Sequence, residues 1–493
     1  MSLRRIRNYI DGRWADADAA DWLAVHNPST GEAIAEVPLS TPAEADRAVA
    51  AAAGAFPAWS ATPVARRCEP LYSLVALLRE NAETINRTLV EEMGKSLPDA
   101  RAEVKRTIEN CQVACGMPIL QQGDKLAGVS EGIDAEVVRV PLGVFAMIAP
   151  FNFPAMVPFW FLPYAIATGN TFVLKPSERV PCTMELIAEF IDQAGLPAGV
   201  FNLVNGDKAV ANALMDSSAV SGVSMVGSTA VCRLVAAKCA RTNKRFQAMG
   251  SAKNHLVVMP DAKIAHVVRN MITSCFGCAG QRCMAASAIV CVGEKTHRQV
   301  VERFVAAARE VPVGDPLDAA YADTDVLIGP VISAAARERI HSLIAEGLAE
   351  GATLALDGRG LVVPGREKGY FIGPTVFVDV QAGMKVHRTE IFGPVVVILK
   401  AGSLDEAIGI INDHQYGNGA SIYTQNGHYA RRFKREVQAG MIGINVGIPA
   451  PAACLPFGGM KASLFADVKT QAGSAVRFFT DERIVTERYW PED

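Results

Sequence analysis

Short apolar runs alternate with helix-like segments from residue 142 onward, and this alternation constrains the fold more than any other feature. The runs GVFAMIAP, TFVLKP and VFNLVNG are typical of buried strands, and residues 154–169 and 182–195 between them are typical of helices. Strands that are apolar throughout and separated by helices form parallel sheets covered on both faces. The sequence therefore predicts an α/β protein.

A second series of the same kind runs from about 256 to about 450 and includes the strand-like segments EIFGPVVVIL and GMIGINVG. We predict two doubly wound α/β domains with a break near 250, which suits a chain of 493 residues. Residues 7–40 alternate short β-like runs with turns, and residues 42–122 show helical spacing. The expected bounds are 1–122 and 142–248 for the first domain and 249–450 for the second.

Residues 123–141 and 475–489 lie outside this scheme because they alternate apolar and polar side chains like exposed strands. Unpaired strand edges invite pairing with another chain. We therefore expect these segments to form a small β element that is covered in a homo-oligomer, a dimer or a tetramer.

The charge distribution narrows the possible partners. There are 48 Lys and Arg against 51 Asp and Glu, the net charge is −3, and no long run of one sign occurs. This pattern argues against nucleic acid as a partner. No window reaches the roughly 18 apolar residues of a membrane span, and the start of the sequence lacks the apolar stretch of a secretory signal. We expect a cytoplasmic protein that acts on a small molecule and has no membrane partner.

Three of the 11 cysteines lie within nine residues, at Cys275, Cys278 and Cys283. A zinc site needs about four ligands, and no second C-x-x-C lies nearby; a thioredoxin-type pair would open a helix directly after a strand. Cys275 and Cys278 instead fall late in an apolar helix-like run, which favours inert buried thiols. Cys283 follows the glycine break of GQR, where a side chain can face a cleft. We expect no metal site here.

Two turns at the ends of predicted strands could bind phosphate or ribose, although neither G-x-G-x-x-G nor a Walker A motif is present. In SMVGSTAV an apolar run enters a short glycine turn and then a helix, so backbone amides there could face a pyrophosphate. In LKPSE, Lys175 and Glu178 follow a parallel strand at its carboxyl end, where ligands bind in open α/β sheets. Each of these signals is weak on its own.

Taken together, these motifs resemble those of the aldehyde dehydrogenase superfamily over nearly the whole chain. The matching elements occur in the family's order and are NPSTGE, PFNFP (150–154), LKPSE (174–178), VGST (226–229), GQRC (280–283), EIFGP (390–394) and PFGG (456–459). The resemblance implies an NAD-binding domain, a catalytic domain and a small oligomerisation element, in agreement with the organisation above.

The resemblance also implies roles for individual residues. Cys283 takes the position of the nucleophile that forms a thioester, and Asn152 that of the side-chain donor to the oxyanion, acting with the backbone N–H of Cys283. Lys175 and Glu178 match the adenosine-ribose contacts, where a carboxylate favours NAD over NADP, and Glu390 matches the contact to the nicotinamide ribose. The remaining implied cofactor contacts are Ala149, Phe151, Arg179, Ser228, Gly250 and Phe392.

The sequence departs from the family's hydrolytic members at one position. They carry a general-base glutamate about 34 residues before the cysteine, where this chain has Met249, or Ala248 if the glycines are matched. No Asp or Glu occurs from Ser217 through Pro260. A thioester that no base helps water to attack should persist until another nucleophile arrives, and a thiol is the natural acceptor.

The stretches GSAKNH and GQRCMA resemble one subgroup, the coenzyme A-acylating methylmalonate and malonate semialdehyde dehydrogenases. In that subgroup two arginines hold the substrate carboxylate, and they correspond here to Arg106 and Arg282. Arg282 would also favour the Cys283 thiolate. The implied reaction oxidises a small semialdehyde with NAD, passes the acyl group to coenzyme A and releases the carboxylate as CO₂ or bicarbonate.

Other interpretations stay open from the sequence. The chain could be a hydrolytic aldehyde dehydrogenase whose base comes from elsewhere in the fold and whose substrate is another small aldehyde. It could also be a binding or structural protein on a dehydrogenase scaffold. The unusual continuation of PFGG, MKASLFAD, leaves the substrate loops undefined, and the sequence does not separate malonate from methylmalonate semialdehyde.

Overall fold

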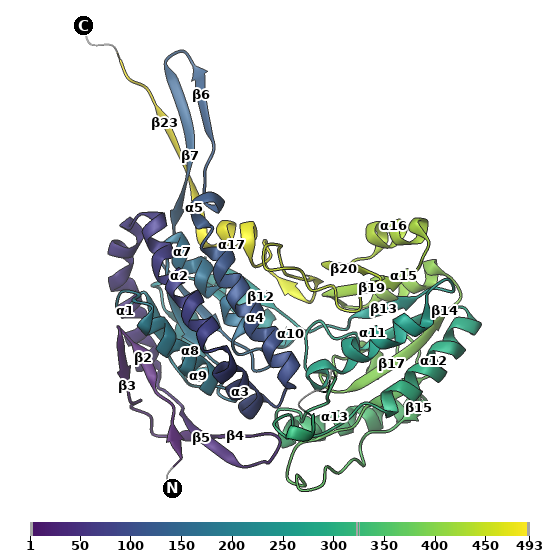
Figure 1. Cartoon of the computed structure of the whole chain (residues 1–493). Coiled ribbons are helices and arrows are strands. Elements are labelled where there is room, and N and C mark those ends of the chain that lie inside the picture. The colour runs from purple at the N-terminus through teal and green to yellow at the C-terminus, as the bar shows by residue number, and fades with distance from the viewer. Residues whose placement is uncertain (1–2, 322–323, 325, 491–493) are drawn as a thin grey trace.

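Two large β-sheets, each covered by helices, form the body of the protein (Figure 1). The computed structural model describes residues 3–321, 324 and 326–490. A smaller three-stranded sheet projects away from the body at the top of the view. The predicted α/β class is confirmed.

The first sheet has eight strands in the order β22-β12-β11-β8-β9-β10-β2-β3. Its five central strands are parallel, and helices join them in sequence order. Three of them, β8, β9 and β10, are the apolar runs that the sequence predicts as buried strands. The edge strands β22, β2 and β3 are antiparallel. The strands are β2 (Asn8–Ile10), β3 (Arg13–Ala15), β8 (Val144–Ile148), β9 (Thr171–Lys175), β10 (Phe201–Leu203), β11 (Val220–Val226), β12 (Arg245–Met249) and β22 (Leu464–Phe465).

Helices cover both faces of this sheet, and the helical spacing of residues 42–122 is confirmed. The helix that concerns the site is α4 (Leu97–Ala114), whose buried face includes the polar residues Glu103 and Asn110. Buried polar side chains need hydrogen-bond partners, so this face of α4 must contact polar groups of neighbouring segments as well as apolar side chains. The other helices of this part are α1 (Pro42–Ala61), α2 (Val64–Glu80), α3 (Ala82–Met93), α5 (Met117–Leu120), α8 (Cys182–Gln193), α9 (Lys208–Asp216) and α10 (Thr229–Arg241).

The second sheet has seven strands in the order β15-β16-β17-β14-β13-β19-β20, all parallel except β15. The predicted strand EIFGPVVVIL begins only at Val395, since the residues before it form an irregular segment. The elements are β13 (His255–Val258), α11 (Ile264–Phe276), β14 (Ala288–Val292), α12 (Glu294–Arg309), α13 (Ala334–Ala349), β15 (Thr353–Leu356), β16 (Thr375–Val378), α14 (Lys385–Arg388), β17 (Val395–Ala401), α15 (Leu404–Asp413), β19 (Gly419–Tyr423), α16 (Gly427–Glu436) and β20 (Met441–Ile444).

The prediction of one helix over residues 154–169 was wrong. Two short helices, α6 (Met156–Phe159) and α7 (Leu162–Thr168), occupy the segment, and Pro163 stands in the first turn of the second. A proline has no N–H and tolerates only the first turn of a helix, so the chain restarts there. Helix α7 does end at Gly169, which takes the left-handed conformation with φ 98°.

The projecting sheet consists of β6 (Lys125–Ser130), β7 (Ile133–Pro141) and β23 (Thr480–Glu487), in the order β23-β7-β6 (Figure 1). The alternating pattern of 123–141 is thus confirmed as strand. The pattern of 475–489 was predicted too long, since residues up to 479 belong to helix α17 (Ala472–Phe479), which buries Ala475, Val476 and Phe479.

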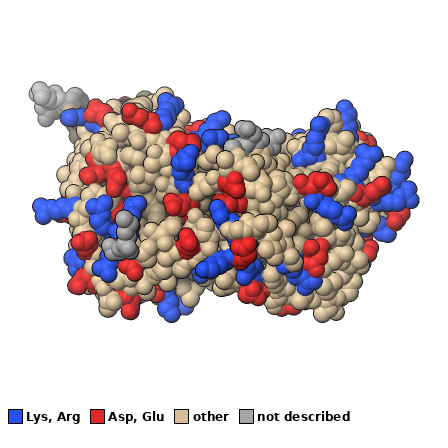
Figure 2. Space-filling model, turned by 60° about the horizontal axis from the view of Figure 1, so that its bottom comes forward, with Lys and Arg blue, Asp and Glu red and all other residues tan. Residues whose placement is uncertain are grey.

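The remaining short elements complete the chain. A small sheet joins β1 (Arg4–Arg5), β5 (Ala33–Pro38) and β4 (Trp22–His26), a two-stranded ribbon pairs β18 (Tyr416–Gly417) with β21 (Met460–Lys461), and two 3₁₀ turns are η1 (Gly277–Gly280) and η2 (Ala319–Tyr321). Across the described residues, every helix is too short or too polar to cross a membrane. On the face in Figure 2, acidic and basic side chains are interspersed.

Candidate active site

Cys283 lies at the end of a tight turn between helix α11 and strand β14. In that turn Cys278 and Ala279 adopt left-handed backbone conformations with φ 53°, and Gly280 follows with φ 71°. A Cβ on Gly280 would lie 2.0 Å from the carbonyl oxygen of Gly393, so the turn accepts only glycine there. The side-chain amides of Asn254 and Asn418 donate to the Cys283 carbonyl at 2.8 and 2.9 Å.

This turn presents the Cys283 side chain to a cavity of about 180 Å³ between the two sheets. Cys283 is partly exposed, whereas Cys275 and Cys278 are buried at 2% and 1% exposure. Burial raises the pKa of Cys278 to about 12. Among the described residues, no group of three or more His, Cys, Asp or Glu side chains is arranged to hold a metal ion. One accessible thiol with two buried neighbours is the arrangement that the sequence predicts.

The Arg282 guanidinium lowers the pKa of Cys283 and so favours its thiolate, in the direction expected from the sequence, but other groups have a larger effect. Burial first, and then the nearby Glu390 carboxylate, raise the pKa of Cys283 to about 12, and the opposing effect of Arg282 does not offset them. The guanidinium of Arg282 also has a carboxylate partner in Asp99, at 2.9 Å.

Asn152 lies in the loop after β8 and donates from Nδ2 to the carbonyl oxygen of Gln281 at 3.0 Å, so its amide reaches the turn that precedes Cys283. Its own carbonyl accepts from Lys95 Nζ at 2.7 Å. Lys95 also pairs with Glu103 on α4, and both side chains are fully buried. The other carboxylate oxygen of Glu103 accepts from the backbone N–H groups of Ala155 and Met156 at 2.9 and 3.1 Å.

The sequence did not predict this buried pair. Lys95 binds the carbonyl of Asn152 and Glu103 binds the N–H groups of Ala155 and Met156, so together they hold the Asn152 loop in place. The Glu103 carboxylate and the Lys95 ammonium compensate each other's charge. Buried charges require such a partner. A signal was available in the sequence: Asp99, Glu103 and Arg106 recur at helical spacing on one face of α4, which is a polar stripe directed at the interior.

The structure brings Arg106 and Arg282 to the wall of the same cavity as Cys283. Each arginine has an acidic partner. Arg282 Nη2 lies 2.9 Å from Asp99, and Arg106 Nη1 lies 2.8 Å from Glu109. The rest of the cavity is mostly apolar and includes Phe153, Met156, Trp160, Ile448 and Phe457. An apolar cavity with two guanidiniums beside a thiol suits a small aldehyde that carries one carboxylate.

The candidate cofactor residues gather where the parallel strands of the first sheet end. Strands β8 and β9 are neighbours, and the backbone N–H of Ala149 donates to the carbonyl of Lys175 at 2.9 Å. Lys175 is buried, which lowers the pKa of its ammonium, and Nζ lies 3.1 Å from Glu178. Ser228 caps α10 at the end of β11, its Oγ accepting from the backbone N–H of Val231.

Two further candidates stand apart from this group. Arg179 is exposed, and its side chain makes no hydrogen bond among those described. Gly250 has no room for a side chain, because a Cβ would lie 2.6 Å from Thr229 Oγ1 and 2.7 Å from the Ala462 carbonyl. The smallest residue is therefore required where the chain passes the start of α10.

Glu390 and Phe392 lie on the other side of Cys283, in the irregular segment before β17. A carboxylate oxygen of Glu390 accepts from the backbone N–H of Ala252 at 2.9 Å, and burial raises its pKa. Phe392 has φ 59°, an unusual conformation for a large residue, and its ring meets that of Phe151 edge-on at 5.7 Å between centroids. The two rings therefore connect the loop after β8 with the segment before β17.

Positions 248 and 249 contain no proton acceptor. Ala248 and Met249 are buried at 0% and 4% exposure at the end of β12. The acids that do line the cavity, Asp99 and Glu103, are paired with Arg282 and Lys95. Within the described part of the chain, every carboxylate on the cavity wall is therefore engaged by a cation.

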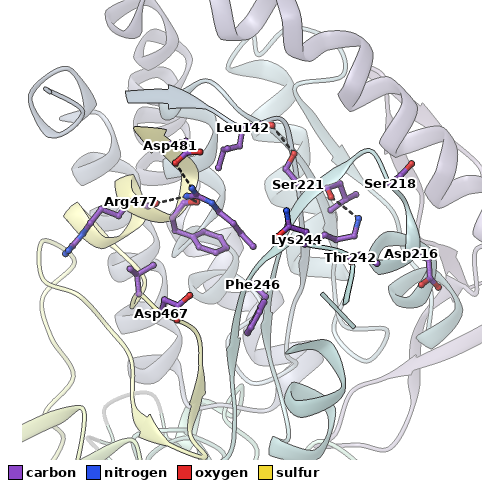
Figure 3. Close-up of a pocket in the computed structure, with 15 residues that line it drawn as sticks. Leu142, Asp216, Ser218, Ser221, Thr242, Lys244, Phe246, Asp467, Arg477 and Asp481 are labelled. Atoms are coloured by element: carbon purple, nitrogen blue, oxygen red, sulfur yellow. Dashed lines mark hydrogen bonds and ion pairs between the residues drawn. The ribbon is translucent and has the colours of Figure 1, made fainter. Parts of the chain in front are cut away.

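A larger cavity, of about 760 Å³, lies at the opposite ends of the strands, where β11 and β12 begin (Figure 3). Two of its cations, Lys244 and Arg245, are already bound by the fold. Lys244 donates to the Val220 carbonyl at 2.9 Å, and Arg245 donates to the carbonyl of Thr480 at 2.8 Å and pairs with Asp481 at 3.1 Å. The contacts of Arg245 attach the start of β23 to the first sheet. Cys283 does not line this cavity.

Comparison with known proteins agrees with this site. The aldehyde dehydrogenase family profile matches residues 14–485, so the chain belongs to the aldehyde dehydrogenase family and is an enzyme. It is 44% identical over 487 residues to the malonate-semialdehyde dehydrogenase of Pseudomonas aeruginosa, covering 99% of this chain and 97% of that protein.

Solved structures extend the comparison. The methylmalonate-semialdehyde dehydrogenase of Oceanimonas doudoroffii superposes with a TM-score of 0.96 at 40% identity, covering 100% of this chain and 99% of that one. A proposed methylmalonate-semialdehyde dehydrogenase of Sinorhizobium meliloti, complexed with NAD, gives 0.96 at 39% identity with the same coverage. The resemblance inferred from the motifs is confirmed.

Proposed function

We propose that the protein catalyses the NAD-dependent, coenzyme A-acylating oxidation of malonate semialdehyde or methylmalonate semialdehyde, giving acetyl-CoA or propanoyl-CoA with loss of CO₂. The observation that carries this proposal is Cys283 in a cavity with two arginines, where both acids among the described lining residues, Asp99 and Glu103, are paired with cations. The names of the relatives support the substrate class.

The first chemical step forms a bond between Cys283 Sγ and the aldehyde carbon. The thiol must lose its proton, and the cavity must hold the developing oxyanion, for which the Asn152 amide and the Cys283 N–H are the donors that we propose. The buried Lys95–Glu103 pair fixes the Asn152 loop, so the donor does not have to be ordered during the reaction.

The fit of the cofactor site can be judged from the residues themselves. Lys175 and Glu178 stand at the carboxyl end of β9, Ser228 caps α10, and the backbone at Gly250 passes close to Thr229 at the start of that helix. These groups suit a dinucleotide with a free ribose hydroxyl, and Glu390 lies beside Cys283 for the second ribose. Held by these residues, NAD would supply the hydride acceptor for the oxidation of the aldehyde carbon.

The second half of the reaction is the release of the acyl group from Cys283, and it depends on the absence of a general base at positions 248 and 249. Met249 and Ala248 offer no base for water, so the acyl group stays on Cys283 until the coenzyme A thiol attacks it. Arg282 and Arg106 hold the carboxylate of the substrate. A carboxylate β to a thioester carbonyl is primed to leave as CO₂, because the carbonyl accepts the electron pair.

The test measures NADH formation from malonate semialdehyde, with and without coenzyme A, together with the thioester product. We expect steady NADH formation only with coenzyme A and no more than one equivalent per active site without it. Equal steady rates under both conditions would mean that water is activated in this cavity, and the protein would then be a hydrolytic aldehyde dehydrogenase.

We further propose that the protein forms a homo-oligomer in the cytoplasm through the sheet β23-β7-β6. All six residues of β6 are exposed, and Leu126, Val129 and Ile484 are 64%, 51% and 69% exposed. An exposed strand with apolar side chains is typical of an interface between copies. Light scattering should give a dimer or a tetramer, and a monomer at micromolar concentration would contradict this.

A further inference from the structure

Asp99 makes two separate contacts with the segment that carries the nucleophile. One carboxylate oxygen lies 2.9 Å from Arg282 Nη2, and the other accepts the backbone N–H of Cys278 at 2.9 Å. Ser96 Oγ donates to the second oxygen at 2.9 Å and also caps the start of α4. A single side chain on α4 therefore touches both the left-handed turn and the arginine that precedes Cys283.

These contacts give the Arg282 guanidinium a fixed position. It lies over Gly277, where a Cβ would be 3.2 Å from Nη1, and it reaches the sulfur of Cys278 at 3.8 Å. The Arg282 side chain is 17% exposed and that of Asp99 is 16% exposed, so both are largely withdrawn from water. Ordering a long arginine side chain costs conformational entropy. Because the folded protein already orders Arg282, substrate binding does not have to order it.

The ionised state of Asp99 follows from the same contacts. Burial alone would raise its pKa, but the Arg282 guanidinium and the Cys278 N–H hold the pKa below its ordinary value. Asp99 thus stays charged at the pH at which enzymes work. The negative charge of Asp99 also weakens the attraction between Arg282 and an anionic substrate. If Asp99 favours substrate binding, it must therefore do so by orienting the Arg282 guanidinium.

We propose that Asp99 is a positioning residue that makes the cavity selective for aldehydes with a carboxylate, because it orients the Arg282 guanidinium. This proposal rests on the function proposed above, in which Arg282 binds the substrate carboxylate. It predicts that Asp99 acts through Arg282 and has no direct contact with the reacting atoms.

The test replaces Asp99 in the full-length enzyme and compares malonate semialdehyde with propanal, a neutral aldehyde of the same carbon number. Asp99→Asn should raise KM for the semialdehyde about 10- to 100-fold, the range expected for a charged hydrogen bond. kcat/KM for propanal and KM for NAD should change less than about threefold. Asp99→Glu keeps the charge and the position in the first turn of α4 and should recover most of the affinity.

The matched control is Asp405→Asn, because Asp405 also stands in the first turn of a helix and pairs with an arginine, Arg432, on the far side of the second domain. It should leave the ratio of the two substrates unchanged. In an Arg282→Gln background, Asp99→Asn should cost less than about threefold, since the group it positions is then absent.

The outcomes separate the two proposals. If Arg282→Gln itself leaves the ratio unchanged, the carboxylate-binding role of Arg282 fails. If Arg282→Gln lowers the ratio and Asp99→Asn does not, the role of Asp99 alone fails. Parallel losses on both aldehydes would show a merely structural residue, and a lower KM for the semialdehyde would show that Asp99 acts as an opposing charge; either result overturns the inference. If Asp99→Asn does not fold, Asp99→Glu carries the test, with a smaller loss expected on the semialdehyde only.

Discussion

The Nε2 atoms of His255 and His387 lie 2.8 Å apart in the buried interior of the second domain, so a single proton joins the two rings. His387 Nδ1 lies 2.7 Å from the Ala382 carbonyl and must donate to it, which makes His255 the donor to His387. His414 continues the network, accepting from the Tyr416 N–H and donating to the carbonyl of His387. Because His387 Nε2 and His414 Nδ1 each accept a hydrogen bond, both of these rings must be neutral.

This network predicts a loss of stability in acid. Burial lowers the pKa of His387 to about 4 and that of His414 to about 3, below the value near 6.5 of an unfolded chain. The unfolded state therefore binds more protons, and the stability contributed by these rings is complete above about pH 6.5 and is lost as the pH falls toward 4. Urea unfolding at pH 5 should give about 2 kcal/mol less per ring than at pH 7.5.

A comparison of two variants checks the origin of this loss. His414→Asn should flatten the decline between pH 7.5 and 5, whereas His428→Asn, at an exposed position on α16, should leave it as in the parent protein. An identical decline in all three proteins would place the acid sensitivity elsewhere.

The contrast between Cys283 and Cys278 predicts two different phenotypes. Cys283→Ala should abolish NADH formation, since the nucleophile is gone, and leave unfolding nearly unchanged. Cys278→Ala should lower the free energy of unfolding by about 1 to 2 kcal/mol, because it leaves a void in a fully packed turn, and should retain activity. Complete loss of activity in both variants, with folding intact, would contradict the assignment of a single nucleophile.

The missing base can be supplied by mutation. A carboxylate at position 249 would be buried, burial would raise its pKa toward neutrality, and it would then be suited to take a proton from water. Met249→Glu should give steady NADH formation without coenzyme A, at least about tenfold above the parent. Met249→Gln has the same shape and no basic carboxylate, so an equal rate in both would refute general-base catalysis from this position.

The lack of room for a side chain at Gly250 predicts a specific effect on cofactor binding. Gly250→Ala would place a Cβ 2.6 Å from Thr229 Oγ1 and 2.7 Å from a backbone carbonyl, so the start of α10 would have to shift. We expect KM for NAD to rise about fivefold or more and the protein to lose about 1 to 3 kcal/mol of stability. Gly54→Ala is the control, since a Cβ on Gly54 meets nothing within 4 Å inside helix α1 and should stabilise it slightly.

The sequence was informative where a signal is local. Apolar runs such as TFVLK predicted the parallel strands, and the glycine in GQR predicted a boundary before Cys283. It failed at 154–169, where the helical spacing concealed the restart at Pro163. It also failed to give the pKa of Cys283, because burial and the distance to Glu390 are set by the tertiary fold.

The missed residues share one property, which is that their partners lie far away in the chain. Asp99 and Arg282 are 183 positions apart, and Lys95 reaches the carbonyl of Asn152 across 57 positions. The helical spacing of Asp99 and Glu103 indicates a polar face on α4, but a single sequence does not show which distant residues that face contacts.

Strand β22 has a consequence for how the polypeptide can be divided. Leu464 and Phe465 come from the far end of the chain and pair with Met249 and Ala248 at the edge of the first sheet. A fragment ending near residue 250 would leave the β12 edge without its neighbour, and open edges of this kind promote aggregation. The two halves are therefore interlaced, and proteolytic cleavage in the segment between them should yield pieces that stay associated instead of two freely diffusing domains.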